Sequence, residues 1–218
     1  MSSVLAFADE LERRDADAAR ELAHVERLHA DVDELRAHAD ATAEFLAALP
    51  ERVAALESDV AAAIAARDDA ESALRVADER LARARKENER LEAERARGEA
   101  IDAIRSAERW VGQARDALTA TRAEGERREE QSHELAARAV ELSARVRDVP
   151  APLGGIAGAI DWAARARGAL LLERASLARE REAIVREANE LAASVLGEPL
   201  VLGSVAGLRD RLRHALGP

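Results

Sequence analysis

Apolar residues recur every three or four positions along most of the chain, which is the spacing of one face of an α-helix. One series runs from Val25 to Leu49, a second from residue 53 to residue 91, and a third from residue 104 to residue 146. Further on, Leu170, Leu177 and Ile184 follow one another at intervals of seven residues. Sustained heptads predict helices that pack together as left-handed coiled coils.

Proline and glycine indicate where these helices end. Before residue 150 the only proline is Pro50, whereas residues 149–155 hold two prolines and two glycines. We therefore expect helices over about residues 4–48, 51–148, 156–196 and 204–216. Pro50 suits the first turn of the second helix, where its missing N–H costs nothing, and Ser204 suits the N-cap of the last helix.

The apolar series changes phase near the middle of the expected helix 51–148. From Arg95 to Ile104 is nine residues, two more than a heptad, and Gly98 lies between them. Glycine in a helix costs about 0.5–1 kcal/mol relative to alanine, so Arg95 and Gly98 are candidates for a hinge. Asn88 also lies on the apolar series, where a polar residue can fix the register of a coiled coil. The alternative is a tolerated, exposed asparagine.

The predicted fold is all-α, with two antiparallel coiled-coil hairpins that share one long central helix in a Z-shaped or elongated bundle. The first hairpin would span residues 1–96 and the second residues 97–196, followed by a short amphipathic helix within residues 197–218. The rival arrangement is a parallel dimer whose first two helices merge through a kink at Pro50. Three contacts would identify the first hairpin: Leu11 with Leu91, Val25 with Ala77, and Leu46 with Leu56.

The composition supports helices and excludes most other folds. The chain holds 53 alanines, 28 glutamates and 32 arginines in 218 residues, and only 2% of its residues are aromatic. So few aromatic and β-branched residues leave a β-sheet little to pack with. The net charge of −10 argues against direct nucleic-acid binding, and the absence of cysteine excludes disulfides and thiol chemistry. Neither a signal peptide nor a stretch of about 18 apolar residues is evident, so the expected location is cytoplasmic.

No catalytic motif or phosphate-binding loop occurs in the sequence, and we expect neither enzyme activity nor a cofactor. Glu21 with His24, and Glu130 with His133, have the Glu-x-x-His spacing that di-iron helical bundles use. Five histidines in a chain with 28 glutamates produce such pairs by chance, so we assign no metal site.

The candidate interaction residues are the two tryptophans and the C-terminal helix. Trp110 is expected to pack beside Val195, Leu196 and residues 199–202, whereas Trp162, close to a turn, is expected to be exposed. The alternative is that a tryptophan anchors a partner, as tryptophan often does in interfaces. The last helix is basic and amphipathic, with candidate residues Leu208, Arg209, Arg211, Leu212 and Arg213. Such a helix packs internally, oligomerises or docks on an anionic membrane.

These features favour a non-enzymatic scaffold or spacer that binds protein partners, with self-association among the options. The alternative is a peripheral membrane protein that docks through its basic C-terminal helix. The charged heptads of residues 51–148 resemble the rod segments of many bacterial coiled-coil proteins and of chromosome-maintenance ATPases. The chain lacks the nucleotide-binding heads of those ATPases, so the resemblance implies a rod and no activity.

Overall fold

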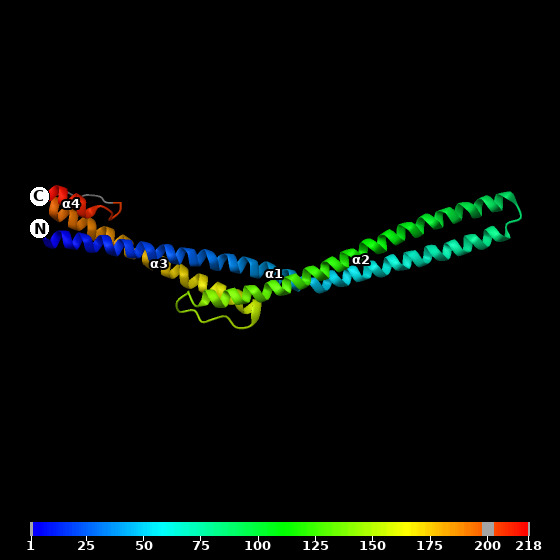
Figure 1. Ribbon diagram of the computed structural model, residues 1–218, viewed down its shortest axis with the longest axis horizontal. Helices are drawn as coiled ribbons and strands as arrows, with labels where there is room; N and C mark the ends of the chain where they lie inside the picture. Colours follow the sequence, from blue (N-terminus) through cyan, green and yellow to red (C-terminus); the bar gives the residue numbers. More distant parts are fainter. Residues whose placement is uncertain (1, 198–202, 218) are drawn as a thin grey trace. The chain divides into compact units, whose positions relative to one another are not determined.

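The computed structural model describes residues 2–197 and 203–217 (Figure 1). Helices make up 90% of this described part and no strand occurs in it, which confirms the all-α prediction. Its helices are α1 (Ser2–Arg83), α2 (Glu87–Ser143), α3 (Gly155–Leu196) and α4 (Leu208–Leu216). The expected third helix is confirmed, whereas α4 begins after Gly207 and not at Ser204.

The long uninterrupted helix is α1, so the expected helix 51–148 is wrong. α1 continues through Pro50, and the chain reverses its direction at residues 84–86. A proline inside a helix removes one backbone hydrogen bond, at a cost of about 3 kcal/mol. Contacts with α2 continue on both sides of Pro50 and hold the helix through it. Phe45 lies 5.4 Å from the guanidinium of Arg128, and Glu57 forms an ion pair with Arg122.

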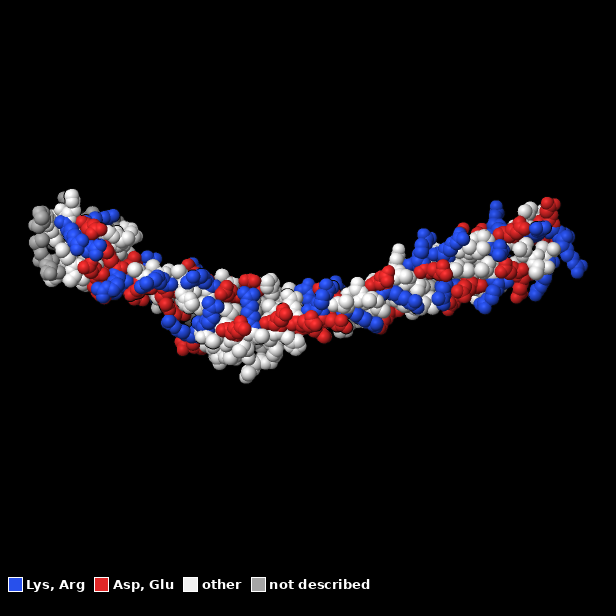
Figure 2. Space-filling model, in the orientation of Figure 1, with Lys and Arg blue, Asp and Glu red and all other residues white. Residues whose placement is uncertain are grey.

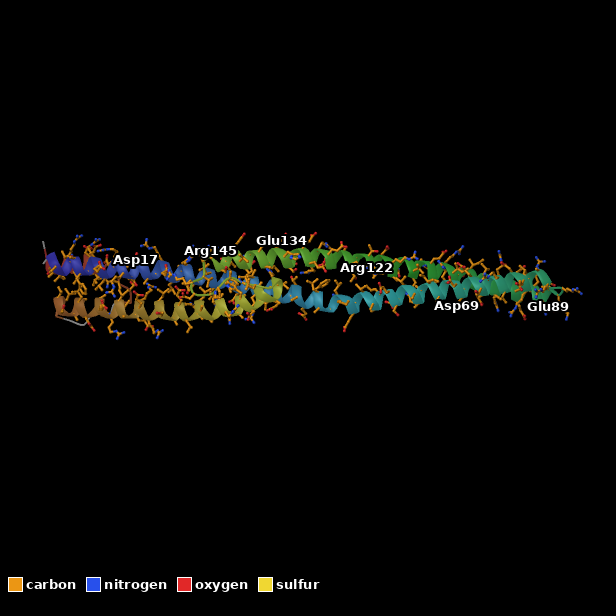
Figure 3. All side chains as sticks on the ribbon, turned by 90° about the horizontal axis from the view of Figure 1, so that it is seen from below. Asp17, Asp69, Glu89, Arg122, Glu134 and Arg145 are labelled. Atoms are coloured by element: carbon orange, nitrogen blue, oxygen red, sulfur yellow. The ribbon has the colours of Figure 1, made fainter. Side chains whose placement is uncertain are left out.

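The reversal contains neither glycine nor proline, which is why the sequence pattern did not reveal it. Its residues are Ala84, Arg85 and Lys86. Glu87 and Glu89 occupy the first turn of α2, where carboxylates stabilise the free N–H groups of a helix (Figure 3). Glu89 also accepts a hydrogen bond from the backbone N–H of Arg85 at 3.3 Å. An acidic first turn therefore marks the start of α2.

The chain divides into two compact units, Met1–Asp40 with His133–Pro218, and Ala41–Ser132. The second unit, called the helix pair below, consists of the later part of α1 and the earlier part of α2 side by side (Figure 1). Asp78 pairs with Arg97 across the two helices, and Glu57 with Arg122, so the helices run in opposite directions. The boundary predicted at residue 96 lies inside this unit.

Buried alanines recur every seven residues where the two helices of the helix pair pack together. Two helices approach each other closely along such a series because the alanine side chain is small. Near the other end of the pair, Gly125 makes room for Leu49, whose Cδ2 would lie 2.5 Å from a β-carbon at residue 125. The buried alanines of the series are Ala63, Ala70 and Ala77 of α1 and Ala93, Ala100, Ala107 and Ala114 of α2.

The contacts predicted for the first hairpin are wrong because the reversal is not at Pro50. Leu46 and Leu56 lie on the same uninterrupted helix. Leu91 is 58% exposed, and Val25 packs in an apolar cluster of the first unit.

The first unit contains two apolar clusters. One gathers residues of α1, the end of α2 and the start of α3 around Trp162, and we call it the Trp162 cluster. The other gathers the start of α1, the end of α3 and α4 around Ile184, and we call it the Ile184 cluster. Helices α1 and α3 are antiparallel here, because Asp33 pairs with Arg167 at 2.8 Å while Asp15 pairs with Arg181 at 3.0 Å.

Candidate functional site

An uncharged stretch connects α2 to α3 in the first unit. Residues 149–160, called the Leu153 segment below, contain no charged side chain in a chain that is 35% charged. Figure 2 shows a white surface over this connection, which is yellow-green in Figure 1. Leu153 is 88% exposed, more than any other large apolar residue in the described part of the chain. The sequence pattern indicated only a turn here; the missing charge was the signal of an exposed apolar surface.

Glycines and packing fix the conformation of the Leu153 segment. Gly154 and Gly155 have φ values of 93° and 64°, in the left-handed region that favours glycine. Gly158 lies against the backbone of Leu153, because a β-carbon at residue 158 would be 1.7 Å from the Leu153 carbonyl oxygen. Three further side chains hold the segment on the Trp162 cluster: Val149, Ile156 and Ile160. Leu153 is therefore displayed by an ordered segment.

The two flanks of the helix pair differ in chemistry. On one flank, the ion pairs of Glu57 with Arg122 and of Asp78 with Arg97 bridge the helices. On the other flank, small apolar residues follow one another at intervals of seven, and Trp110 stands among them with 43% of its surface exposed. This second flank is called the alanine flank; it consists of Ala66, Ala73 and Val76 of α1 and Ala96, Ala103, Trp110 and Ala117 of α2.

A groove of about 540 Å³ lies on the alanine flank near the turn. Its apolar floor includes Ala73 of α1 and Ala103 of α2. Arg80 of α1 and Glu99 of α2 form opposite sides of its rim. The groove therefore has a basic side and an acidic side.

A second groove, of about 550 Å³, lies at the other end of the same flank. It is lined by Phe45 and Ala120, with Arg52 of α1 and Glu124 of α2 among its rim residues. Arg52 precedes Ala66 by two heptads, and Glu124 follows Ala117 by one, which places this groove on the alanine flank. Both grooves thus take arginine from α1 and glutamate from α2.

The two tryptophans are placed opposite to expectation. Trp110 is exposed on the helix pair, whereas Trp162 is fully buried in the first unit. Trp162 is enclosed because three helices meet around it, and the predicted hairpin contained only two. Val195 and Leu196, the expected neighbours of Trp110, pack on the Ile184 cluster. Residues 199–202, the rest of that expected contact, lie outside the described residues.

The apolar face of α4 is buried in the first unit. Leu208 and Leu212 belong to the Ile184 cluster and are at most 1% exposed. The backbone N–H of Arg209 donates a hydrogen bond to Glu12 of α1 at 3.0 Å. Since the N-cap residue Gly207 has no side chain to cap the helix, this carboxylate from α1 supplies the cap.

The basic face of α4 lies beside carboxylates. Arg209 pairs with Asp210 at 3.3 Å and with Asp9 of α1 at 3.1 Å, and these two carboxylates raise the pKa of the Arg209 guanidinium. Arg213 lies 3.8 Å from Asp210, and Arg211 is exposed. Arg209 therefore helps to hold α4 on α1.

Asn88 and Gly98 lie close to the turn of the helix pair. Asn88 is exposed in the first turn of α2, away from the buried series. α2 is unbroken through Arg95 and Gly98, and Ala93 and Ala100 are buried on either side of them. The phase shift in the sequence therefore reflects a new helix that starts after residues 84–86. A hinge at Gly98 stays a prediction about the motion of the protein.

The described residues contain no group of three or more histidine, cysteine, aspartate or glutamate side chains suited to a metal ion. Glu21, from one of the Glu-x-x-His pairs, accepts a hydrogen bond from Arg147 at 2.6 Å. Among residues 2–197 and 203–217, none of the helices contains an apolar stretch that could span a lipid bilayer.

No protein family model, curated protein or solved structure matches this chain. The fold defines an all-α protein that displays two exposed apolar surfaces, the Leu153 segment in the first unit and the alanine flank of the helix pair.

Proposed function

We propose that the chain is a non-enzymatic scaffold that binds partner proteins, and that the Leu153 segment is its main binding site. The observation that carries the proposal is the 88% exposure of Leu153 on an uncharged segment of a highly charged protein. Exposed apolar patches rimmed by polar residues mark protein interfaces, because covering them removes apolar surface from water.

The order of the Leu153 segment favours binding. Gly158 packs against the Leu153 backbone, and Ile156 and Ile160 pack on the Trp162 cluster. A partner would therefore immobilise few additional side chains, which lowers the entropic cost of association. Complete burial of a leucine side chain contributes about 1.5–3 kcal/mol, or roughly a 10- to 100-fold gain in affinity.

We further infer that the helix pair is an antiparallel coiled coil that serves as a spacer. The seven-residue interval of its buried alanines supports this, since coiled coils bury such a series along their seam. The larger residues Leu74, Ile104 and Leu118 recur between the alanines at the alternate seam position and are partly buried. At 1.5 Å per residue, the α1 part of the pair is about 65 Å long.

The binding proposal is tested with Leu153→Ser and a matched control, Leu172→Ser. Leu172 is also an exposed leucine of the first unit, at 74%, but lies on α3 away from the segment. Each tagged variant is used to retrieve proteins from the source organism, and a photo-crosslinking residue at position 153 or 172 identifies direct contacts. A partner retained by the wild type and by L172S but lost by L153S supports the proposal. Identical partners for all three proteins would overturn it.

Docking on a membrane through α4 requires a change of structure. Two of its leucines, Leu208 and Leu212, would have to leave the Ile184 cluster before they could enter a lipid surface. Arg209 would also have to part from Asp9. Protein binding needs no such change, and we therefore propose it in preference.

A further inference from the structure

We infer that the alanine flank of the helix pair binds the same flank of a second copy of this chain, with the two turns at the same end. The assembly would be a four-helix bundle in which α1 of each copy faces α2 of the other. Its two-fold axis would run parallel to the helices, between the two copies.

The rim charges of the grooves favour this partner and this orientation. In each groove the arginine comes from α1 and the glutamate from α2: Arg80 with Glu99, and Arg52 with Glu124. Rotation about an axis parallel to the helices places the α1 rim of one copy over the α2 rim of the other, at the same height. Arginine then meets glutamate at both ends of the interface. Glu124 already pairs with Arg127 and Arg128 of its own helix and would add Arg52 of the second copy to them, and the two charge contacts together set the direction of the encounter.

The opposite orientation would bring like charges together. Turning the second copy end for end places α1 over α1, so that Arg80 of one copy approaches Arg52 of the other. Asp59 and Asp69, the acidic residues of α1 on this flank between the grooves, have no like-charged partner in the aligned arrangement. At their heights the flank of α2 carries Ala117 and Ser106. The aligned arrangement is therefore the one that the charges permit.

The shapes of the side chains also fit a second copy. Ala73 and Ala103 line the same groove and so lie at the same height on the two helices. One heptad further from the turn, Ala66 lies at the height of Trp110. In the aligned pair each Trp110 would therefore face an alanine of the other copy, and large against small side chains pack without voids.

The available area is sufficient for a specific dimer. From residue 52 to residue 80, α1 rises about 42 Å at 1.5 Å per residue. With a width of about 15 Å for two adjacent helices, each copy would bury about 600 Å². Two copies would then bury about 1,200 Å², at the lower end of the range for stable protein interfaces. Every buried apolar residue of the helix pair except Val111 is alanine, so the core of the helix pair buries little apolar area. Packing against a second copy would add apolar burial to this core.

The first test measures the mass of the full chain by sedimentation equilibrium at protein concentrations from about 1 to 100 μM. We expect a species of twice the 23.5 kDa of one chain. Ala103→Glu puts a charge into the interface and should weaken the dimer by at least about tenfold. Ala123→Glu, the same substitution at an exposed position of α2 outside the flank, is the control and should change nothing. A wild type that stays monomeric, or equal dimerisation of A103E and A123E, would overturn the inference.

The second test fixes the orientation, and the absence of native cysteine makes it direct. Single cysteines at Ala73→Cys and at Ala117→Cys should each crosslink to the same residue of the second copy through a short bismaleimide. In an end-for-end dimer these positions would be separated from their equivalents by about 14 residues of helix, or about 21 Å. Arg115→Cys on the opposite flank should not crosslink. Failure of both flank cysteines in a dimeric sample would refute the aligned arrangement. L153S should leave the dimer intact, so this inference and the proposed function fail separately.

Discussion

Replacing Gly158 with alanine should destabilise the first unit, although alanine is the better helix former. The new β-carbon would lie 1.7 Å from the carbonyl oxygen of Leu153 and 2.5 Å from its carbonyl carbon. Both atoms belong to the backbone, so no side-chain rotation relieves the clash. Overpacking of this kind costs about 1–3 kcal/mol, against a gain of about 0.5–1 kcal/mol from the alanine.

Gly168→Ala is the matched control on the same helix, because a β-carbon there meets nothing within 4 Å. It should raise the free energy of unfolding by about 0.5–1 kcal/mol, so the two variants should differ by about 1–3 kcal/mol. Urea unfolding followed by circular dichroism at 222 nm measures the difference. G158A should also lose the partner that L153S loses, because the clash displaces the segment that displays Leu153. If G158A were as stable as G168A and kept that partner, the result would refute the idea that packing against Gly158 holds the Leu153 segment in its conformation.

Two further substitutions test how α3 and α4 are held on α1. Asp15→Ala removes the carboxylate that accepts two hydrogen bonds from Arg181. It should lower the free energy of unfolding by about 1–3 kcal/mol. The control Asp17→Ala, at an exposed position, should change the free energy of unfolding by less than about 0.5 kcal/mol. Leu212→Ala leaves a cavity at a fully buried position of the Ile184 cluster. It should lower the free energy of unfolding, measured in urea, by about 2–4 kcal/mol, and the loss cannot exceed the free energy that holds α4 in place. The control Arg211→Ala, at an exposed position, should leave the free energy of unfolding unchanged.

The helices bounded by strong local signals could be predicted from the sequence. The two prolines and two glycines of residues 149–155 correctly separated a long helix from α3. The heptads of Leu170 and Ile184 indicated that the segment after them is helical. The position of Trp162 could not be predicted in this way. Its burial depends on three helices that meet from distant parts of the chain, and local periodicity does not report which faces meet.

The prediction that a helix ends at Pro50 was wrong because packing against α2 outweighs the local preference of proline for helix ends. Its cost in a helix interior is about 3 kcal/mol, which a continuous series of contacts with α2 can offset. The Leu49–Gly125 contact lies next to the proline and extends the seam across it. Such compensation lies in the partner helix and is invisible in the sequence around Pro50.

The turn of the helix pair contains no glycine or proline, but it can be detected in the sequence as a shift in the phase of the apolar series. The buried series of α1 includes Ala70 and Ala77, and its phase extrapolates to residues 84, 91 and 98. The buried residues of α2 are Ala93 and Ala100, so the seam moves by two residues across the turn. A continuous helix cannot shift its buried face in this way without losing its partner, whereas a new helix chooses its own phase. Between the buried Ala77 and Ala93, the phase shift spans the acidic first turn at Glu87. A phase shift across such a turn indicates a reversal even where glycine and proline are absent.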